Sequence, residues 1–191
     1  MKTTLLSFVA AAALLVSSPA AAQGFVSPYI GWNFGGEAKC LDVAGCEEHT
    51  TAFGVGFGSL GRVFGFEQEF GYTKNFFGEA PTYGSDMLTV MSNVMITVPI
   101  PAVKPYFLTG IGLIRAHVEP TVGSIVFAGG NATNEFGWDM GGGLIVGGSF
   151  GVRGDIRYFK TFQDVEIAGF SLNSSEKLNF GRASVGVFFK F

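Results

Sequence analysis

The last nine residues of the chain read ASVGVFFKF, residues 183–191, and their pattern decides the fold. Every second side chain from Ala183 to Phe191 is apolar. The positions between them are small or polar apart from one aromatic ring: Ser184, Gly186, Phe188 and Lys190. Alternation with a period of two places the apolar side chains on one face of an extended chain. The segment is therefore predicted to be a β-strand with one apolar face.

The same alternation recurs along the chain. It predicts eight strands, at 25–34, 51–60, 62–73, 87–98, 104–117, 135–148, 151–162 and 178–191. The connections are alternately long and short, the long ones being 35–50, 74–86, 118–134 and 163–177. An even number of strands of about 10 residues, joined in this way, is typical of a membrane-spanning barrel. We predict an all-β fold, namely an eight-stranded antiparallel up-and-down transmembrane β-barrel.

The composition excludes several classes of protein. Charged residues make up 14% of the 191 residues, against roughly 25% in an ordinary soluble domain. The net charge of −3 argues against a nucleic-acid partner, which selects clustered Lys and Arg. High hydrophobicity excludes intrinsic disorder. Beyond the N-terminus every apolar run is too short for a membrane helix, which needs about 20 residues.

The N-terminus has the features of a secretory signal peptide. Lys2 supplies the positive start, Leu5 to Val16 forms an apolar stretch, and the small residues Ala20 to Ala22 form a cleavage site. The sequence predicts a cleaved signal over 1–22 and one barrel domain over 23–191. The mature chain would carry a net charge of −4 and reside where disulfides form.

The face that contacts lipid distinguishes a membrane barrel from a soluble, lipocalin-like carrier. The apolar face of the strands is continuous and aromatic, and the strand charges lie on the opposite face. An Arg or Lys in lipid would cost about 2–4 kcal/mol at the bilayer midplane. We expect these charges to pair inside the barrel and to serve stability. The predicted interior network comprises Glu67, Glu69, Arg153, Asp155, Arg157 and Arg182.

Glycines and aromatic residues fit this polarity. Glycines share the inward face and would make room for long charged side chains. They are Gly54, Gly56, Gly58, Gly110, Gly112, Gly137, Gly141 and Gly143. Aromatic residues gather near both ends of the predicted strands, as the two girdles of a spanning barrel require.

The whole mature chain resembles the small outer-membrane barrels of Gram-negative bacteria, the OmpA/OmpX-type and opacity-like, porin-like group. The resemblance rests on the signal peptide, the hairpin rhythm and the terminal strand ending in Phe191. It implies a monomer in the cell outer membrane. Phe191 is similar to the assembly signal that the barrel assembly machinery recognises, and recognition of the open edge of the last strand would be strand addition.

The first long connection contains both cysteines. Cys40 and Cys46 are expected to form a disulfide in an oxidising compartment. A metal site with His49, Glu47 and Glu48 is the alternative, but the spacing of the two cysteines is not a zinc pattern. We expect no metal and no cofactor.

Three basic residues follow the lipid-facing side of their strands near the long-loop end. Lys74, Arg115 and Lys160 are predicted to contact phosphates of lipopolysaccharide. Simple extension of these side chains into solvent is the alternative.

The sequence therefore favours a structural or surface-interaction protein with displayed loops and a plugged interior. A narrow diffusion pore is one alternative. A lipid-modifying enzyme is the other, and we expect no enzyme because Ser92 lies far from His117, whose expected neighbour is Asp86.

Overall fold

The computed structural model describes residues 22–36, 50–77, 83–122, 125–126, 131–162 and 177–191. It contains nine strands: β1 (Gln23–Phe34), β2 (Thr51–Leu60), β3 (Phe64–Lys74), β4 (Tyr83–Thr97), β5 (Val103–Val122), β6 (Ile125–Val126), β7 (Asn131–Gly147), β8 (Phe150–Thr161) and β9 (Asn179–Lys190). Strand β6 has two residues and pairs only with the end of β5. In this part of the chain no helix is long and apolar enough to cross a membrane.

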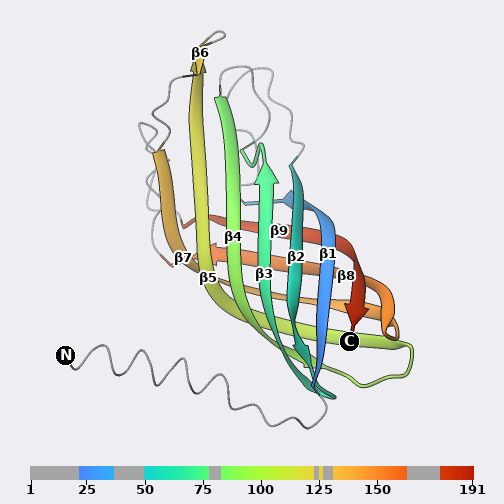
Figure 1. The fold of residues 1–191 in the computed structure, drawn as a ribbon. Coiled ribbons are helices and arrows are strands. Elements are labelled where there is room, and N and C mark those ends of the chain that lie inside the picture. Colours follow the sequence, from blue (N-terminus) through green and yellow to red (C-terminus); the bar gives the residue numbers. More distant parts are fainter. Residues whose placement is uncertain (1–21, 37–49, 78–82, 123–124, 127–130, 163–176) are drawn as a thin grey trace, which may run out of the picture.

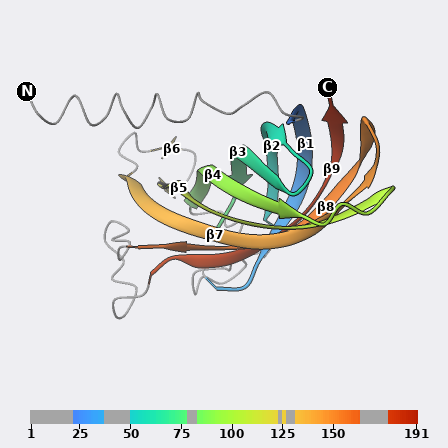
Figure 2. The ribbon, with the colours of Figure 1, turned by 90° about the horizontal axis from the view of Figure 1, so that it is seen from below.

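The other eight strands form a closed antiparallel ring (Figure 1). Each strand pairs with its neighbours in sequence, β5 with β7 across the small β6. Strand β1 pairs with β2 on one side and with β9 on the other, which closes the barrel. Seen from below, the strands curve around a common interior (Figure 2). The predicted eight-stranded β-barrel is confirmed.

The two ends of the barrel differ. Residues 61–63, 98–102 and 148–149 form three short turns at the end where β1 begins and β9 ends. We call this the turn end, and the opposite end the loop end. In the turn that joins β7 to β8, the N–H of Gly147 donates to the carbonyl of Ala102 at 2.9 Å, which ties this turn to the one before β5.

Three strands are longer at the loop end than the sequence predicted. Strand β4 begins at Tyr83, β5 continues to Val122, and β7 begins at Asn131. Strands β4 and β5 rise above the other strands of the ring in Figure 1. Much of the segment predicted as a loop over 118–134 is therefore strand. Above the membrane a strand needs no apolar outer face, so the alternation that identifies it in the sequence disappears.

The predicted polarity of the barrel is confirmed. Along β8, Ile156 is 61% exposed on the outside, while its chain neighbours Asp155 and Arg157 are buried inside at 7% and 4%. Exposed aromatic rings gather on the outer surface towards both ends. Towards the loop end are Trp32, Phe34, Tyr72, Phe136, Tyr158 and Phe162, and towards the turn end are Phe57, Phe64, Phe107, Phe189 and Phe191. The soluble-carrier alternative is wrong, since its apolar face would be inside.

Candidate functional site

The interior of the barrel is filled by three layers of side chains. A charged layer lies between two apolar clusters, one towards the loop end and one towards the turn end. The charged layer holds four carboxylates and three guanidinium groups, all buried: Glu67, Glu69, Asp139, Asp155, Arg153, Arg157 and Arg182.

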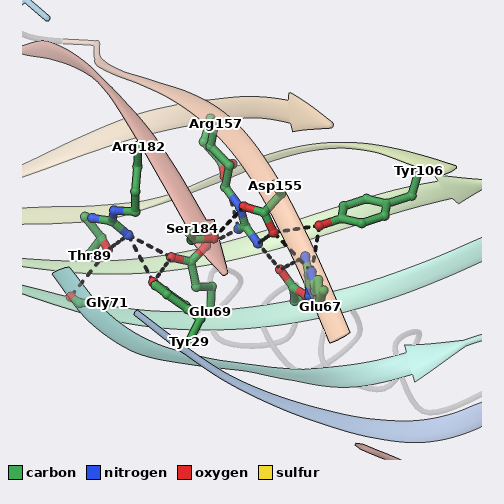
Figure 3. A network of polar contacts seen from close by, with 12 residues as sticks. Tyr29, Glu67, Glu69, Gly71, Thr89, Tyr106, Asp155, Arg157, Arg182 and Ser184 are labelled. Atoms are coloured by element: carbon green, nitrogen blue, oxygen red, sulfur yellow. Dashed lines mark hydrogen bonds and ion pairs between the residues drawn. The ribbon is translucent and has the colours of Figure 1, made fainter. Parts of the chain in front are cut away.

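Arg157 lies at the centre of the charged layer (Figure 3). Its Nε donates to Asp155 Oδ1 at 3.0 Å, and its Nη2 donates to Glu67 Oε1 at 2.9 Å. Its Nη1 also donates to Glu69. One guanidinium on β8 thus joins two carboxylates on β3 across the barrel, because a rigid planar fork can serve several acceptors at once.

Arg153 and Tyr106 form the side of the network nearer the turn end. Arg153 pairs with Glu67, and its Nε donates to the Tyr106 hydroxyl at 2.6 Å. That hydroxyl donates to Asp155 Oδ2, also at 2.6 Å. The Arg153 guanidinium lies 4.8 Å from the centre of the Tyr106 ring, which adds a cation–π contact.

Arg182 forms the side nearer the loop end. Its Nη1 donates to Glu69 Oε1 at 2.9 Å, and its Nε donates to Asn33 Oδ1 at 3.0 Å. The Tyr29 hydroxyl donates to the same carboxylate oxygen of Glu69. The six residues that the sequence predicted for the interior network therefore lie together in one network.

The network also has uncharged members, which were not predicted from the sequence. Tyr29, Asn33 and Tyr106 share the inward face of their strands with the charged residues. In the orientation that satisfies both ends of its amide, Asn93 donates to Asp139 Oδ1 at 2.7 Å and accepts from Arg157. Strand parity was the signal that could have identified Tyr29, Asn33 and Tyr106.

Two glycines show how the layer is accommodated. A Cβ on Gly71 would lie 2.6 Å from Arg182 Nη1 and 2.8 Å from the Tyr29 hydroxyl. A Cβ on Gly56 would lie 3.0 Å from Glu67 Oε2. Inward glycines therefore make room for long charged side chains, as predicted.

The apolar cluster towards the loop end closes the barrel above the charges. The left-handed φ of 54° at Asn75 turns the chain after β3, and the next two residues, Phe76 and Phe77, are completely buried. Rings stack at its base, where Phe159 and Phe180 lie 4.7 Å apart. The cluster comprises Phe76, Phe77, Met87, Met91, Ile114, Phe159, Leu178 and Phe180.

The apolar cluster towards the turn end closes the barrel below the charges. It comprises Phe25, Leu60, Met95, Tyr106, Leu108, Ile145 and Phe188. The rings of Phe25 and Phe188 lie 5.2 Å apart across the seam between β1 and β9. Neither apolar cluster was predicted as a layer of the interior.

The three predicted lipopolysaccharide contacts lie on the outer surface near the loop end, but not together. Lys74 and Arg115 are exposed on β3 and β5, on either side of β4. Between them, Asp86 lies opposite Lys74 on one side and His117 on the other. Lys160 lies on β8, half-buried beside Trp138 and on the far side of the ring.

Phe191 lies at the seam that closes the barrel. Its N–H donates to the carbonyl of Gly24 at 2.9 Å, which extends the pairing of β9 with β1. A Cβ on Gly24 would lie 2.6 Å from the Phe191 ring, so the ring covers this glycine.

The structure describes only some of the other predicted sites. Cys40 and Cys46 fall outside the described residues, as does the signal peptide through residue 21. Ser92 faces outward and exchanges hydrogen bonds with Gln68, and its partner on β5 is Ile111, six positions before His117. Among the described residues, no group of three His, Cys, Asp or Glu side chains is placed to hold a metal ion.

Solved structures with the same fold are outer-membrane barrels. The neisserial surface protein A structure has a TM-score of 0.58 at 14% identity, covering 89% of this chain and 97% of that one. Ail, the attachment invasion locus protein of Yersinia pestis, has a TM-score of 0.56 at 14% identity, covering 90% and 99%. The N-terminal barrel domain of OprF from Pseudomonas aeruginosa has a TM-score of 0.50 at 13% identity, covering 88% and 97%.

Sequence comparison assigns the family. No curated protein matches this chain significantly. The family model described as the outer membrane protein beta-barrel domain matches residues 8–191. With that match over nearly the whole chain, and with the closed barrel of inward charges and outward apolar rings, the chain belongs to the outer membrane protein beta-barrel domain family.

Proposed function

We propose that this protein is a non-conducting, non-enzymatic surface protein of the Gram-negative outer membrane. Its sealed barrel anchors the loops at the loop end, which face the outside of the cell, while the turn end faces the periplasm. The observation that supports this most strongly is the filled interior. A solute would have to pass two apolar layers and displace a charged layer whose members hydrogen-bond to one another.

A conductance measurement distinguishes the proposed surface protein from the alternative, a diffusion pore. The mature protein is reconstituted into planar bilayers, and its folded state is verified by a gel shift on heating. We expect no discrete conductance steps. Stable steps from folded protein would overturn the proposal and favour the pore.

The proposed contact with lipopolysaccharide rests on the cations of the outer surface. Lys74 and Arg115 flank Asp86 on one side of the barrel, and Lys160 lies on the other. Trp138 pairs with Lys160, and Tyr72 lies two residues before Lys74 on the same face of β3, so both sites lie at the level of the aromatic girdle. Cations at that depth face the phosphates of the outer leaflet. The proposal is therefore two phosphate contacts on opposite sides of one barrel.

Retention of lipopolysaccharide on the purified protein tests these contacts. A triple variant with Lys74→Gln, Arg115→Gln and Lys160→Gln is expected to retain less of it. The matched control removes three cations at the turn end, by Arg62→Gln, Lys104→Gln and Lys190→Gln. Equal retention by both triple variants and the unchanged protein would end this part of the proposal, whereas the sealed barrel would stand.

The role of Phe191 in assembly is also part of the proposal. What supports it is the position of its ring and N–H on the closing seam. Before closure the edge of β9 is unpaired, and an unpaired edge is the surface that strand addition uses. The assembly machinery is the proposed partner, and the closed ring of strands is consistent with a monomer.

A further inference from the structure

A cavity of about 190 Å³ opens at the turn end of the barrel. It lies below the apolar cluster of that end. Leu60 belongs to this cluster and also lines the cavity. It is lined by Gln23, Leu60, Gly61, Arg62, Thr97, Pro99, Lys104 and Lys190. These residues come from the start of β1, the turn after β2, the end of β4, the start of β5 and the end of β9, so the cavity spans the mouth.

The charged residues that line the cavity are all cations. Arg62, Lys104 and Lys190 supply three positive charges, and none of the residues that line it is acidic. Lys104 and Lys190 line the same cavity, which places their positive charges near each other. Two like charges held at short range repel, and an anion between them removes that cost.

Among the residues that the structure describes, no acidic side chain lines the cavity to balance these cations. The three short turns, at 61–63, 98–102 and 148–149, contain no Asp or Glu. The carboxylates of the interior lie beyond the apolar cluster and are engaged by arginines.

The rim of the mouth shows what surrounds the cavity. Apolar side chains project outward around it, with Phe64 67%, Phe150 64% and Phe191 80% exposed. Aromatic rings at the end of a spanning barrel lie at the level of the lipid headgroups. In a protein of this family the turn end faces the inner, phospholipid leaflet, so phosphate groups are the anions present at this depth.

We propose that this cavity binds a phosphate group, and that the headgroup of an anionic phospholipid of the inner leaflet supplies it. A phosphate with its hydration fits the volume, and its oxygens accept from an arginine fork and two ammonium groups at once. The site would hold the turn end in the inner leaflet, independently of any lipopolysaccharide contact at the loop end.

The test uses the isotopically labelled mature protein, folded in a neutral detergent and followed by NMR. Dihexanoyl phosphatidylglycerol and inorganic phosphate are titrated separately. We expect saturable shifts of the amides of Arg62, Lys104, Lys190 and their neighbours with the lipid. Similar shifts with inorganic phosphate would mean that the site recognises the phosphate group from either source. Smaller shifts with inorganic phosphate than with the lipid would mean that the lipid is the preferred source.

Two double variants complete the test. Lys104→Gln with Lys190→Gln is expected to weaken binding roughly tenfold or more, because two cation contacts are lost. Lys39→Gln with Lys177→Gln removes as many charges from residues that belong neither to this cavity nor to the proposed lipopolysaccharide contacts, and is expected to leave the affinity unchanged. Unchanged resonances of the interior show that each variant is folded. The proposal would be overturned if no saturable shift is seen at the turn end. It would also be overturned if the Lys104→Gln, Lys190→Gln variant binds the lipid as tightly as the unchanged protein does.

Discussion

Arg157 on β8 and Glu69 on β3 are paired across the barrel interior, 88 positions apart in the sequence. The two strands are on opposite sides of the ring, separated by β4, β5 and β7 on one side. Both side chains are buried, and Arg157 also holds Glu67 and Asp155. The pair joins opposite walls of the barrel through one guanidinium group.

Removal of this guanidinium should destabilise the barrel strongly. We expect Arg157→Met to lower the free energy of unfolding by about 3–5 kcal/mol, because four buried carboxylates lose a partner. Urea unfolding in lipid vesicles, followed by tryptophan fluorescence, measures this. Arg62→Met at the turn end is the control and should change stability by only about 0.5 kcal/mol. Equal effects of the two substitutions would contradict the central place of Arg157.

Inward glycines that touch the charged layer should not tolerate a methyl group. Gly71→Ala would place a Cβ 2.6 Å from both Arg182 Nη1 and Thr89 Oγ1. The overpacking should cost about 1–3 kcal/mol of unfolding free energy. The matched control is Gly154→Ala, where the nearest atom would lie 3.8 Å away. If both variants unfold at the same urea concentration as the unchanged protein, the interior is looser than described.

The terminal ring should matter for assembly more than for anchoring. We expect Phe191→Ala to reduce the fraction of protein that reaches the outer membrane folded, since the closing seam loses the ring that covers Gly24. Heat-dependent gel migration of membrane fractions measures that fraction. Phe150→Ala is the control, because Phe150 is 64% exposed on the same rim but lies within the chain. A comparable loss in both variants would show that any rim aromatic suffices.

The predicted processing can be read from one intact mass. We expect the purified protein to begin at Gln23 and to weigh two hydrogen atoms less than the reduced chain, because of a disulfide between Cys40 and Cys46. Reduction and alkylation should then add two alkyl groups. Alkylation without prior reduction would contradict the disulfide, and a mass that includes Met1 would contradict cleavage.

The strands and the charged layer could be predicted because their pattern is local. In β8 the charges of Arg153, Asp155 and Arg157 alternate with apolar residues, so parity alone assigns them to one face. Which carboxylate meets which arginine depends on the register and curvature of the ring, and no local pattern encodes those.

The two apolar layers were missed for a specific reason. Met87, Met91 and Met95 face inward on β4, where the outward residues are also apolar, for example Leu88 and Val94. With both faces apolar, the two-residue period carries no information about which side is inside. Similarly, Phe76 and Phe77 fall in a segment that reads as a loop, yet the turn after β3 buries them.

Spin-label accessibility at Ile156 tests the polarity of the barrel most directly, because this residue lies between Asp155 and Arg157. A label is attached to Ile156→Cys in a protein that also carries Cys40→Ser and Cys46→Ser, reconstituted in lipid vesicles. With Ile156 facing lipid, collisions with dissolved oxygen are frequent and collisions with a water-soluble nickel chelate are rare. A label that meets the chelate readily and oxygen little would contradict a barrel with apolar residues outside and charges inside.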